Sequence, residues 1–115
     1  MAEPLPPEAA LTLAALLAGP DPVSGALRAQ VRHTRVTGRC GCGCVTVDLV
    51  VDRAAVPPAP AHPNPAADAW YAGPDGAGVM VFTEDGYLSS LEVYAASGDP
   101  VTAWPKPSFA ASPED

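Results

Sequence analysis

The sequence predicts an α+β fold in which two short N-terminal helices pack on an antiparallel sheet of three to five strands. Apolar residues recur at helical spacing up to about residue 34 and at alternate positions from residue 35 onward. A chain of 115 residues can bury one hydrophobic core. We therefore expect residues 1–115 to form a single domain, with a helical part at 1–34, the sheet at 35–96 and an irregular tail at 97–115.

Proline and glycine mark the ends of both helices. The first helix is expected to begin at Pro6-Pro7-Glu8, because proline suits the first turn of a helix, and to end at Gly19-Pro20. Asp21 is the expected N-cap of the second helix, with Pro22 at its first position. The apolar stripes of the two helices are Ala9, Ala10, Leu13, Leu16 and Leu17, and then Val23, Leu27 and Val31.

Alternation of apolar and polar residues predicts the strands that follow. Residues 45–51 place four apolar residues on one face: Val45, Val47, Leu49 and Val51. Residues 53–68 contain five prolines and favour an extended connection lying on the surface. A short strand is expected at Trp70-Tyr71, and Trp104 is expected to anchor the tail.

The clearest expected strand pair is the hairpin Val79–Thr83 and Tyr87–Tyr94. Asp85-Gly86 lies between them, and this residue pair tolerates positive φ at both central positions of a two-residue turn. A regular register would place Met80 opposite Leu91. Since Leu88 and Leu91 are three positions apart, either one of them is exposed or a bulge forms at Ser89-Ser90.

The net charge of −7 excludes several classes of partner. An acidic protein lacks the basic surface that nucleic acids and anionic membranes attract, so we expect neither partner. Residues 1–67 are neutral overall, and residues 68–115 carry the whole negative charge. The apolar run at 11–17 follows two acids and no basic residue, unlike a signal peptide, and the three clustered cysteines do not form a secreted disulfide framework; both features favour the cytoplasm.

The alternating cysteines Cys40, Cys42 and Cys44 form the most unusual motif, with His33 upstream. Three thiolates and one imidazole can hold zinc, so these four residues are candidate metal ligands and zinc is the candidate cofactor. The spacing is closer than that of usual structural zinc sites. The alternatives are reactive-thiol or redox chemistry and, more simply, small strand residues that pack as modest hydrophobes.

Four of the six basic residues fall between positions 28 and 39. Arg28 and Arg32 are four residues apart on one helix face, so they are candidate ligands for an anion. The alternative is a solvated helix face that pairs with the acidic C-terminal half, with Glu92 across the sheet as the partner.

The sequence indicates no catalytic residues. It lacks the spacings of nucleotide-binding glycine loops and the GxSxG nucleophile elbow. His62 lies among prolines, where an exposed side chain without a catalytic role is the expectation. The aromatic residues Trp70, Tyr71, Tyr94 and Trp104 could form a patch for a partner or pack in the core.

Two segments carry a resemblance to a known group of proteins. The first is Arg35 to Leu49 with its CxCxC pattern, and the second is the hairpin DGYLSSLEVY at 85–94, which is followed by Gly98-Asp99-Pro100 and Trp104-Pro105. Together they resemble small uncharacterised bacterial proteins, common in actinobacteria, that combine an N-terminal helical part with such a hairpin. The hairpin is also similar to that of immunity-type proteins of bacterial toxin systems. The resemblance implies the fold and assigns no catalytic residue.

These observations favour a small non-catalytic protein-interaction domain, immunity-like or regulatory, over an enzyme. Its expected partner is a basic protein, bound by the acids Glu84, Asp85 and Glu92. A weak edge strand could also pair with a second copy, so both a monomer and a homodimer are open. The alternative function is a metal-binding or thiol-redox protein built on the cysteine cluster.

Overall fold

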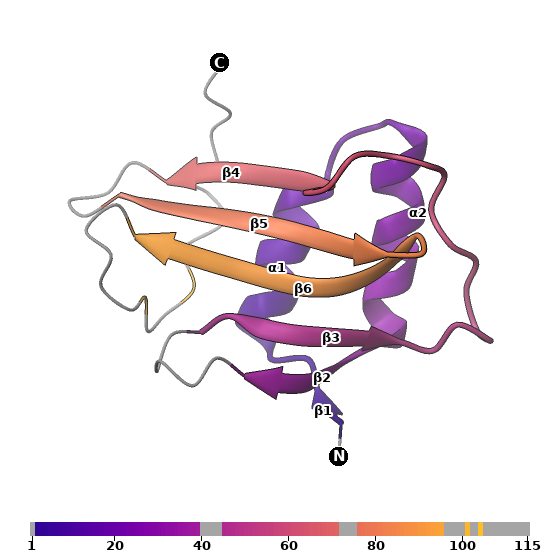
Figure 1. Ribbon diagram of the computed structural model, residues 1–115, viewed down its shortest axis with the longest axis horizontal. Coiled ribbons are helices and arrows are strands. Elements are labelled where there is room, and N and C mark those ends of the chain that lie inside the picture. Colours follow the sequence, from indigo (N-terminus) through magenta and orange to yellow (C-terminus); the bar gives the residue numbers. More distant parts are fainter. Residues whose placement is uncertain (1, 40–44, 72–75, 96–100, 102–103, 105–115) are drawn as a thin grey trace.

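The computed structural model describes residues 2–39, 45–71, 76–95, 101 and 104 (Figure 1). Their elements in chain order are β1 (Glu3–Pro4), α1 (Pro7–Leu16), α2 (Pro22–Gln30), the 3-10 turn η1 (Val31–His33), β2 (Thr34–Arg39), β3 (Val47–Val51), β4 (Ala67–Tyr71), β5 (Ala77–Glu84) and β6 (Tyr87–Ala95). The described strands form one antiparallel sheet in the order β1-β2-β3-β6-β5-β4. The predicted α+β class is confirmed.

The described sheet has six strands where we expected three to five. The additional strand is β1, a pair of residues that lies on the edge beside β2. Two residues are too few for a detectable alternation, and Pro4 is a poor strand former except at a sheet edge. Pairing with β2 therefore makes this segment a strand, which its own residues do not indicate.

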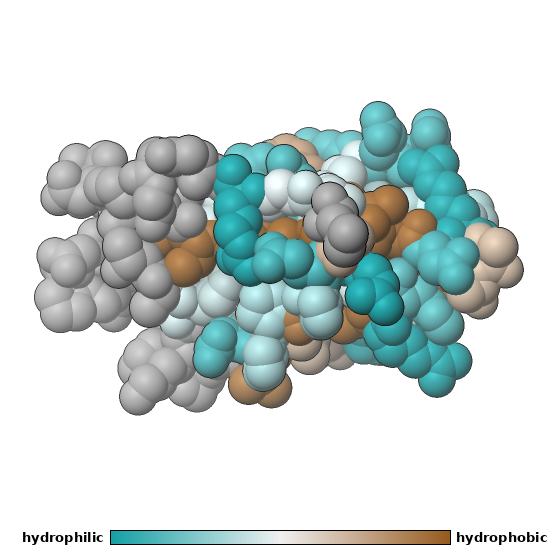
Figure 2. Space-filling model, turned by 90° about the horizontal axis from the view of Figure 1, so that it is seen from below, coloured by the Kyte–Doolittle hydropathy of each residue, from teal (hydrophilic) through white to brown (hydrophobic). Residues whose placement is uncertain are grey.

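Both helices lie against the same face of the sheet (Figure 1). Leu13, Leu17 and Leu27 are fully buried beneath them, and they meet the apolar positions of the strands. Those strand positions are Val36, Val47, Leu49, Val51, Val79, Val81, Leu88, Leu91 and Val93. Figure 2 shows hydrophobic residues in a band across the middle of the view, with hydrophilic residues above and below. Trp104 packs against this core, in keeping with the anchor role expected from the sequence.

The helix boundaries follow the expected local signals. Pro7 is the first residue of α1, and Pro22 is the first residue of α2. The Asp21 carboxylate accepts a hydrogen bond from the backbone N–H of Ser24 at 3.0 Å, which is the N-cap predicted from the sequence. That backbone hydrogen bond lowers the pKa of Asp21 below its ordinary value of 3.8, with a second contribution from the Ser24 side chain.

The β5–β6 hairpin has the predicted turn and a bulge, which was one of the two alternatives that the sequence left open. Both turn residues have positive φ, 56° at Asp85 and 85° at Gly86. Thr83 pairs with Leu88, whereas Phe82 pairs with Ser90, so the register shifts by one residue at this point. The expected pairing of Met80 with Leu91 is therefore wrong, and Met80 pairs with Glu92. The shift turns Leu88 and Leu91 toward the same buried face, which a regular hairpin could not do.

The proline-rich connection runs over the surface from β3 to β4, as predicted, and it is fastened to the hairpin turn. Ala59 donates its backbone N–H to the Gly86 carbonyl at 2.8 Å, and Tyr87 donates its hydroxyl to the Val56 carbonyl at 3.2 Å. Val56 and Ala59 are buried against the core. A Cβ on Gly86 would lie 2.7 Å from the Pro58 Cβ, so only glycine allows this close approach.

Candidate functional site

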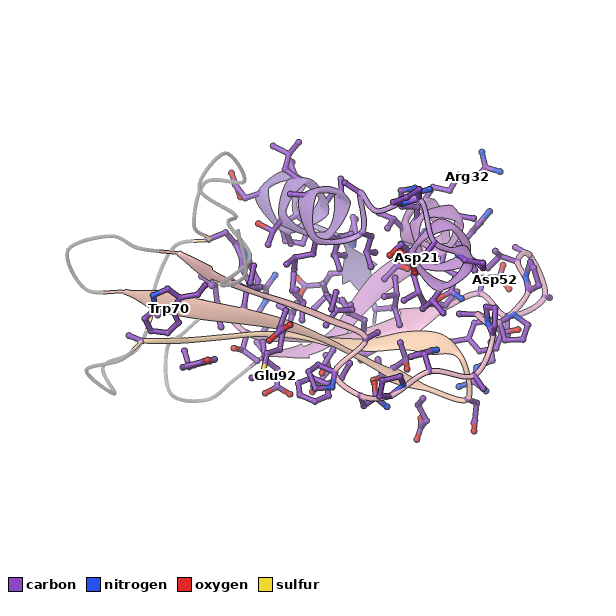
Figure 3. All side chains as sticks on the ribbon, turned by 90° about the horizontal axis from the view of Figure 1, so that it is seen from above. Asp21, Arg32, Asp52, Trp70 and Glu92 are labelled. Atoms are coloured by element: carbon purple, nitrogen blue, oxygen red, sulfur yellow. The ribbon has the colours of Figure 1, made fainter. Side chains whose placement is uncertain are left out.

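The candidate site is the sheet face that the helices do not cover. In Figure 3 the helices lie on one side of the sheet and Glu92 lies on the other, and the strand register places Trp70 on the same face as Glu92. Paired residues of neighbouring strands share a face, so the strand register identifies the other members. They include Asp48, Val50, Asp68, Met80, Phe82, Ser90 and Tyr94. We call this surface the open face.

The open face carries three of the four exposed large hydrophobic side chains in the described part of the chain. Among the described residues, the large hydrophobic side chains that are clearly exposed are Leu11, Val50, Trp70 and Tyr94, and only Leu11 lies on a helix. Met80 and Phe82 are half-buried between the exposed residues of this face. An exposed apolar side chain is common alone, but a group of them on one side of a sheet is typical of a surface that meets a partner.

Two aromatic rings form a pair across three strands. Trp70 on β4 and Tyr94 on β6 both neighbour Gly78 of β5 in the register, and their ring centroids are 6.1 Å apart at 51°. A Cβ on Gly78 would overlap the Tyr94 ring, and one on Gly76 would come within 2.7 Å of the Trp70 ring. The absence of side chains at Gly76 and Gly78 therefore leaves room for the two rings on the sheet surface, where they form an apolar platform.

Carboxylates lie beside this platform on one side. Asp68, Met80 and Glu92 form a second row across β4, β5 and β6, so the two acids lie about 10 Å apart on either side of the methionine by strand spacing. Asp48 lies on β3, opposite Ser90 of β6. Arg35 of β2, opposite Val50, is the basic residue that the register places on this face within the described strands. The open face is therefore apolar and negatively charged.

The three predicted partner-binding acids are separated by the fold. Glu92 lies in the middle of the open face and accepts a hydrogen bond from Ser90 Oγ at 3.2 Å. Glu84 lies at the end of β5, opposite Tyr87. Asp85 lies in the turn and pairs with Arg53 at 3.4 Å, and that guanidinium also lies 4.6 Å from the Tyr87 ring centroid.

Two acids of the open face were not singled out from the sequence. Asp48 and Asp68 belong to strands whose neighbours are far away in the chain. Alternation showed that Asp48 faces away from the core, but only the strand order shows that it shares a surface with Glu92. No local signal marks this grouping.

The predicted anion ligands lie in different surroundings. Arg28 donates to the Leu17 carbonyl and, at 2.5 Å, to the Gly19 carbonyl, so its guanidinium caps the C-terminal end of α1. Arg32 is exposed and donates from Nε to His33 Nε2 at 3.3 Å. Together with Arg35 and Asp52 it lines a hollow of about 490 Å³, where the charges have mixed signs. Glu92 lies on the opposite side of the sheet from α2, so the expected pairing of this arginine stripe with Glu92 is wrong.

The candidate metal ligands lie mostly outside the described residues. The segment 40–44, which contains Cys40, Cys42 and Cys44, is outside the described residues. His33 ends the turn η1 that precedes β2. The six residues of β2 separate His33 from Cys40, which corresponds to about 20 Å of extended chain. Within the described part of the chain, His, Cys, Asp and Glu side chains form no group that could hold a metal ion.

His62 is half-buried, although an exposed side chain was expected. Its Nδ1 lies 2.6 Å from the Pro60 carbonyl oxygen, and its Nε2 lies 2.7 Å from Thr83 Oγ1. Asn64 accepts the backbone N–H of Thr83 and donates to its carbonyl oxygen, both at 3.0 Å. These bonds attach the proline-rich connection to the end of β5, and the alanine- and proline-rich composition of the loop did not indicate them.

Among the described residues, no helix is both long enough and apolar enough to cross a membrane. Comparison with protein-family models, with curated proteins and with solved structures returns no significant match. The open face is therefore interpreted from its own geometry and charge.

Proposed function

We propose that the protein is a non-catalytic interaction domain, immunity-like or regulatory, that binds a basic protein through the open face. The observation that carries this proposal is the combination of the Trp70–Tyr94 platform with the flanking acids Asp68 and Glu92. Aromatic anchors at the centre of a patch supply most of the binding free energy in protein interfaces. The carboxylates of Asp68 and Glu92 would attract a basic partner and repel an acidic one.

The charge distribution supports a partner of this kind. The protein carries a net charge of −7, and the segment from residue 68 onward, which contains β4 to β6, holds all of it. Opposite charge raises the rate of encounter, and this effect falls as added salt shortens the Debye length below about 10 Å. We further propose that the domain acts in the cytoplasm, which the clustered cysteines favour because they do not suit a disulfide framework.

The test measures binding of a partner isolated from the source cells by photo-crosslinking from an unnatural amino acid at position 92. Isothermal titration then compares Trp70→Ala and Glu92→Gln with the wild type. We expect Trp70→Ala to weaken binding by about 2 kcal/mol, roughly 30-fold in Kd, as for other buried aromatic anchors. Glu92→Gln keeps the shape of the side chain and should raise Kd by roughly fivefold at low salt.

The chain offers matched controls on the helix layer. Leu11 is 59% exposed on α1, and Glu8 is an exposed acid in the first turn of the same helix. Leu11→Ala and Glu8→Gln should leave Kd unchanged. An acidic partner, or an affinity that falls equally in the control variants and the open-face variants, would show that binding occurs elsewhere.

A further inference from the structure

The two edges of the described sheet differ in how well they are protected against strand pairing. One edge is β1, which has two residues and includes Pro4. Short length and proline are common ways to prevent an edge from pairing. The other edge is β4, Ala67–Tyr71, which has five residues and contains neither proline nor lysine. Natural sheets rarely leave such an edge strand without a use or a cover.

The side chains of β4 connect this edge to the open face. Asp68 and Trp70 are exposed there, and each begins one of the two rows described above. The row that begins at Asp68 continues through Met80 to Glu92, and the row that begins at Trp70 continues through Gly78 to Tyr94. A strand added beside β4 would extend both rows by one residue, since side chains of adjacent strands are near neighbours on each face.

We infer that the partner binds by adding an extended strand to the β4 edge. This inference rests on the proposed function, because it names how the basic partner meets the open face. Main-chain hydrogen bonds to β4 would supply affinity, and side chains on the open face would supply specificity. A basic residue of the partner would lie beside Asp68 and an apolar residue would lie beside Trp70. Because Asp68 and Trp70 are two positions apart, the partner pattern is a basic and an apolar residue separated by one position.

The charge of the protein favours a different protein over a second copy as the added strand. Another copy would bring a net charge of −7 to a surface that already holds Asp68 and Glu92. Repulsion between like charges opposes this pairing at low salt, while a lysine or arginine beside Asp68 would be attracted.

The probe for this inference is the synthetic peptide acetyl-TKTVTKTVT-amide, in which lysine and valine alternate along one face of an extended strand. Its control is acetyl-TKPVTKPVT-amide, where two prolines remove backbone N–H donors and leave the charge and the apolar residues unchanged. We expect the first peptide to bind at least tenfold more tightly. Hydrogen exchange at the amides of residues 67–71 should slow in its presence. Equal affinity for both peptides, or no added protection in β4, would overturn strand addition.

Two charge-reversal variants distinguish strand addition from docking on the middle of the face. Asp68→Lys changes the edge strand itself, whereas Glu92→Lys changes a strand two positions further in. We expect peptide binding to weaken by roughly thirtyfold or more for Asp68→Lys and by less than about tenfold for Glu92→Lys, because the added strand would lie beside β4 and three strand spacings from β6. Equal losses for both variants would overturn strand addition and keep the open face as the binding surface, so the two proposals can fail separately. A dimer of the wild type that Asp68→Lys dissociates would identify a second copy as the occupant and would also overturn the inference.

Discussion

The side-chain Oε1 of Gln30 accepts a hydrogen bond from the backbone N–H of Leu88 at 2.9 Å. Gln30 is the last residue of α2 and is fully buried, and its Nε2 donates to the Gly86 carbonyl at 2.9 Å and to the Pro57 carbonyl at 3.3 Å. One amide side chain therefore joins the end of a helix, the hairpin and the proline-rich connection. It also provides the backbone N–H of Leu88 with an acceptor at the point where the strand register shifts, beside Ser89.

Replacing this amide should destabilise the fold. We expect Gln30→Leu to lower the free energy of unfolding by about 1–3 kcal/mol, because the buried Leu88 N–H would lose its acceptor. Chemical denaturation measures the change. Gln30→Glu retains an acceptor but loses both donated bonds and buries a charge, so it should be at least as destabilising at neutral pH. A loss below about 0.5 kcal/mol in both variants would contradict the role we assign to this side chain.

The attachment of the proline-rich connection to β5 depends on Asn64. Asn64→Ala removes both partners of the Thr83 backbone, and we expect a loss of about 1–2 kcal/mol in unfolding free energy. Asn64→Asp keeps the acceptor for the Thr83 N–H and should cost less. Hydrogen exchange at Thr83 provides a local reading, since its amide should exchange faster in the alanine variant only. Unchanged exchange at Thr83 in that variant would contradict this attachment.

The N-cap of α2 makes stability depend on pH in a defined direction. The pKa of Asp21 is lowered in the folded state by the backbone N–H of Ser24, so its carboxylate stabilises the fold above the unfolded value of 3.8. That contribution is lost as the pH falls through the lower, folded-state value. Asp21→Asn keeps a capping side chain without the charge, and Asp21→Ala removes both.

We therefore expect the thermal midpoint to fall in the order wild type, Asp21→Asn, Asp21→Ala at pH 7. The gap between the wild type and Asp21→Asn should shrink as the solution is acidified below about pH 4. Thermal scans across that range measure the gap. A gap that grows on acidification would contradict the sign of the pKa shift.

Gly78 provides a test of the aromatic platform that leaves the core intact. Gly78→Ala places a methyl group against the Tyr94 ring, so the ring must rotate away and the pair with Trp70 is lost. We expect a small change in unfolding free energy, within about 1 kcal/mol, because Tyr94 is 47% exposed. Partner affinity should fall as in Tyr94→Ala. Undisturbed affinity with a displaced ring, seen by NMR, would exclude the platform from binding.

Native mass spectrometry under reducing conditions tests the candidate zinc site of Cys40, Cys42, Cys44 and His33. The simpler interpretation is that the cysteines pack as small strand residues, so we expect the mass of the polypeptide without a metal increment. A zinc increment that acid removes and that Cys42→Ser abolishes would contradict this expectation and would favour the metal-binding alternative.

Local chemistry determined much of the fold. The Asp21-Pro22 start of α2, the Asp85-Gly86 turn and the alternation in β3 each depend on residues a few positions apart, so they could be predicted from the sequence. The bulge could be predicted as one of two alternatives, because the spacing of Leu88 and Leu91 requires a bulge unless one of the two side chains is exposed.

Only the tertiary structure decided which of these features meet. Asp48, Asp68 and Glu92 belong to three strands, and the strand order, which local patterns do not encode, brings them onto one face. Arg28 became a cap of α1, and His62 became a partner of Thr83, because packing of distant segments gave them those neighbours. The sequence by itself determined the α+β class and the acidic charge. Long-range strand pairing, driven by burial of the shared core, decided where that charge forms a surface.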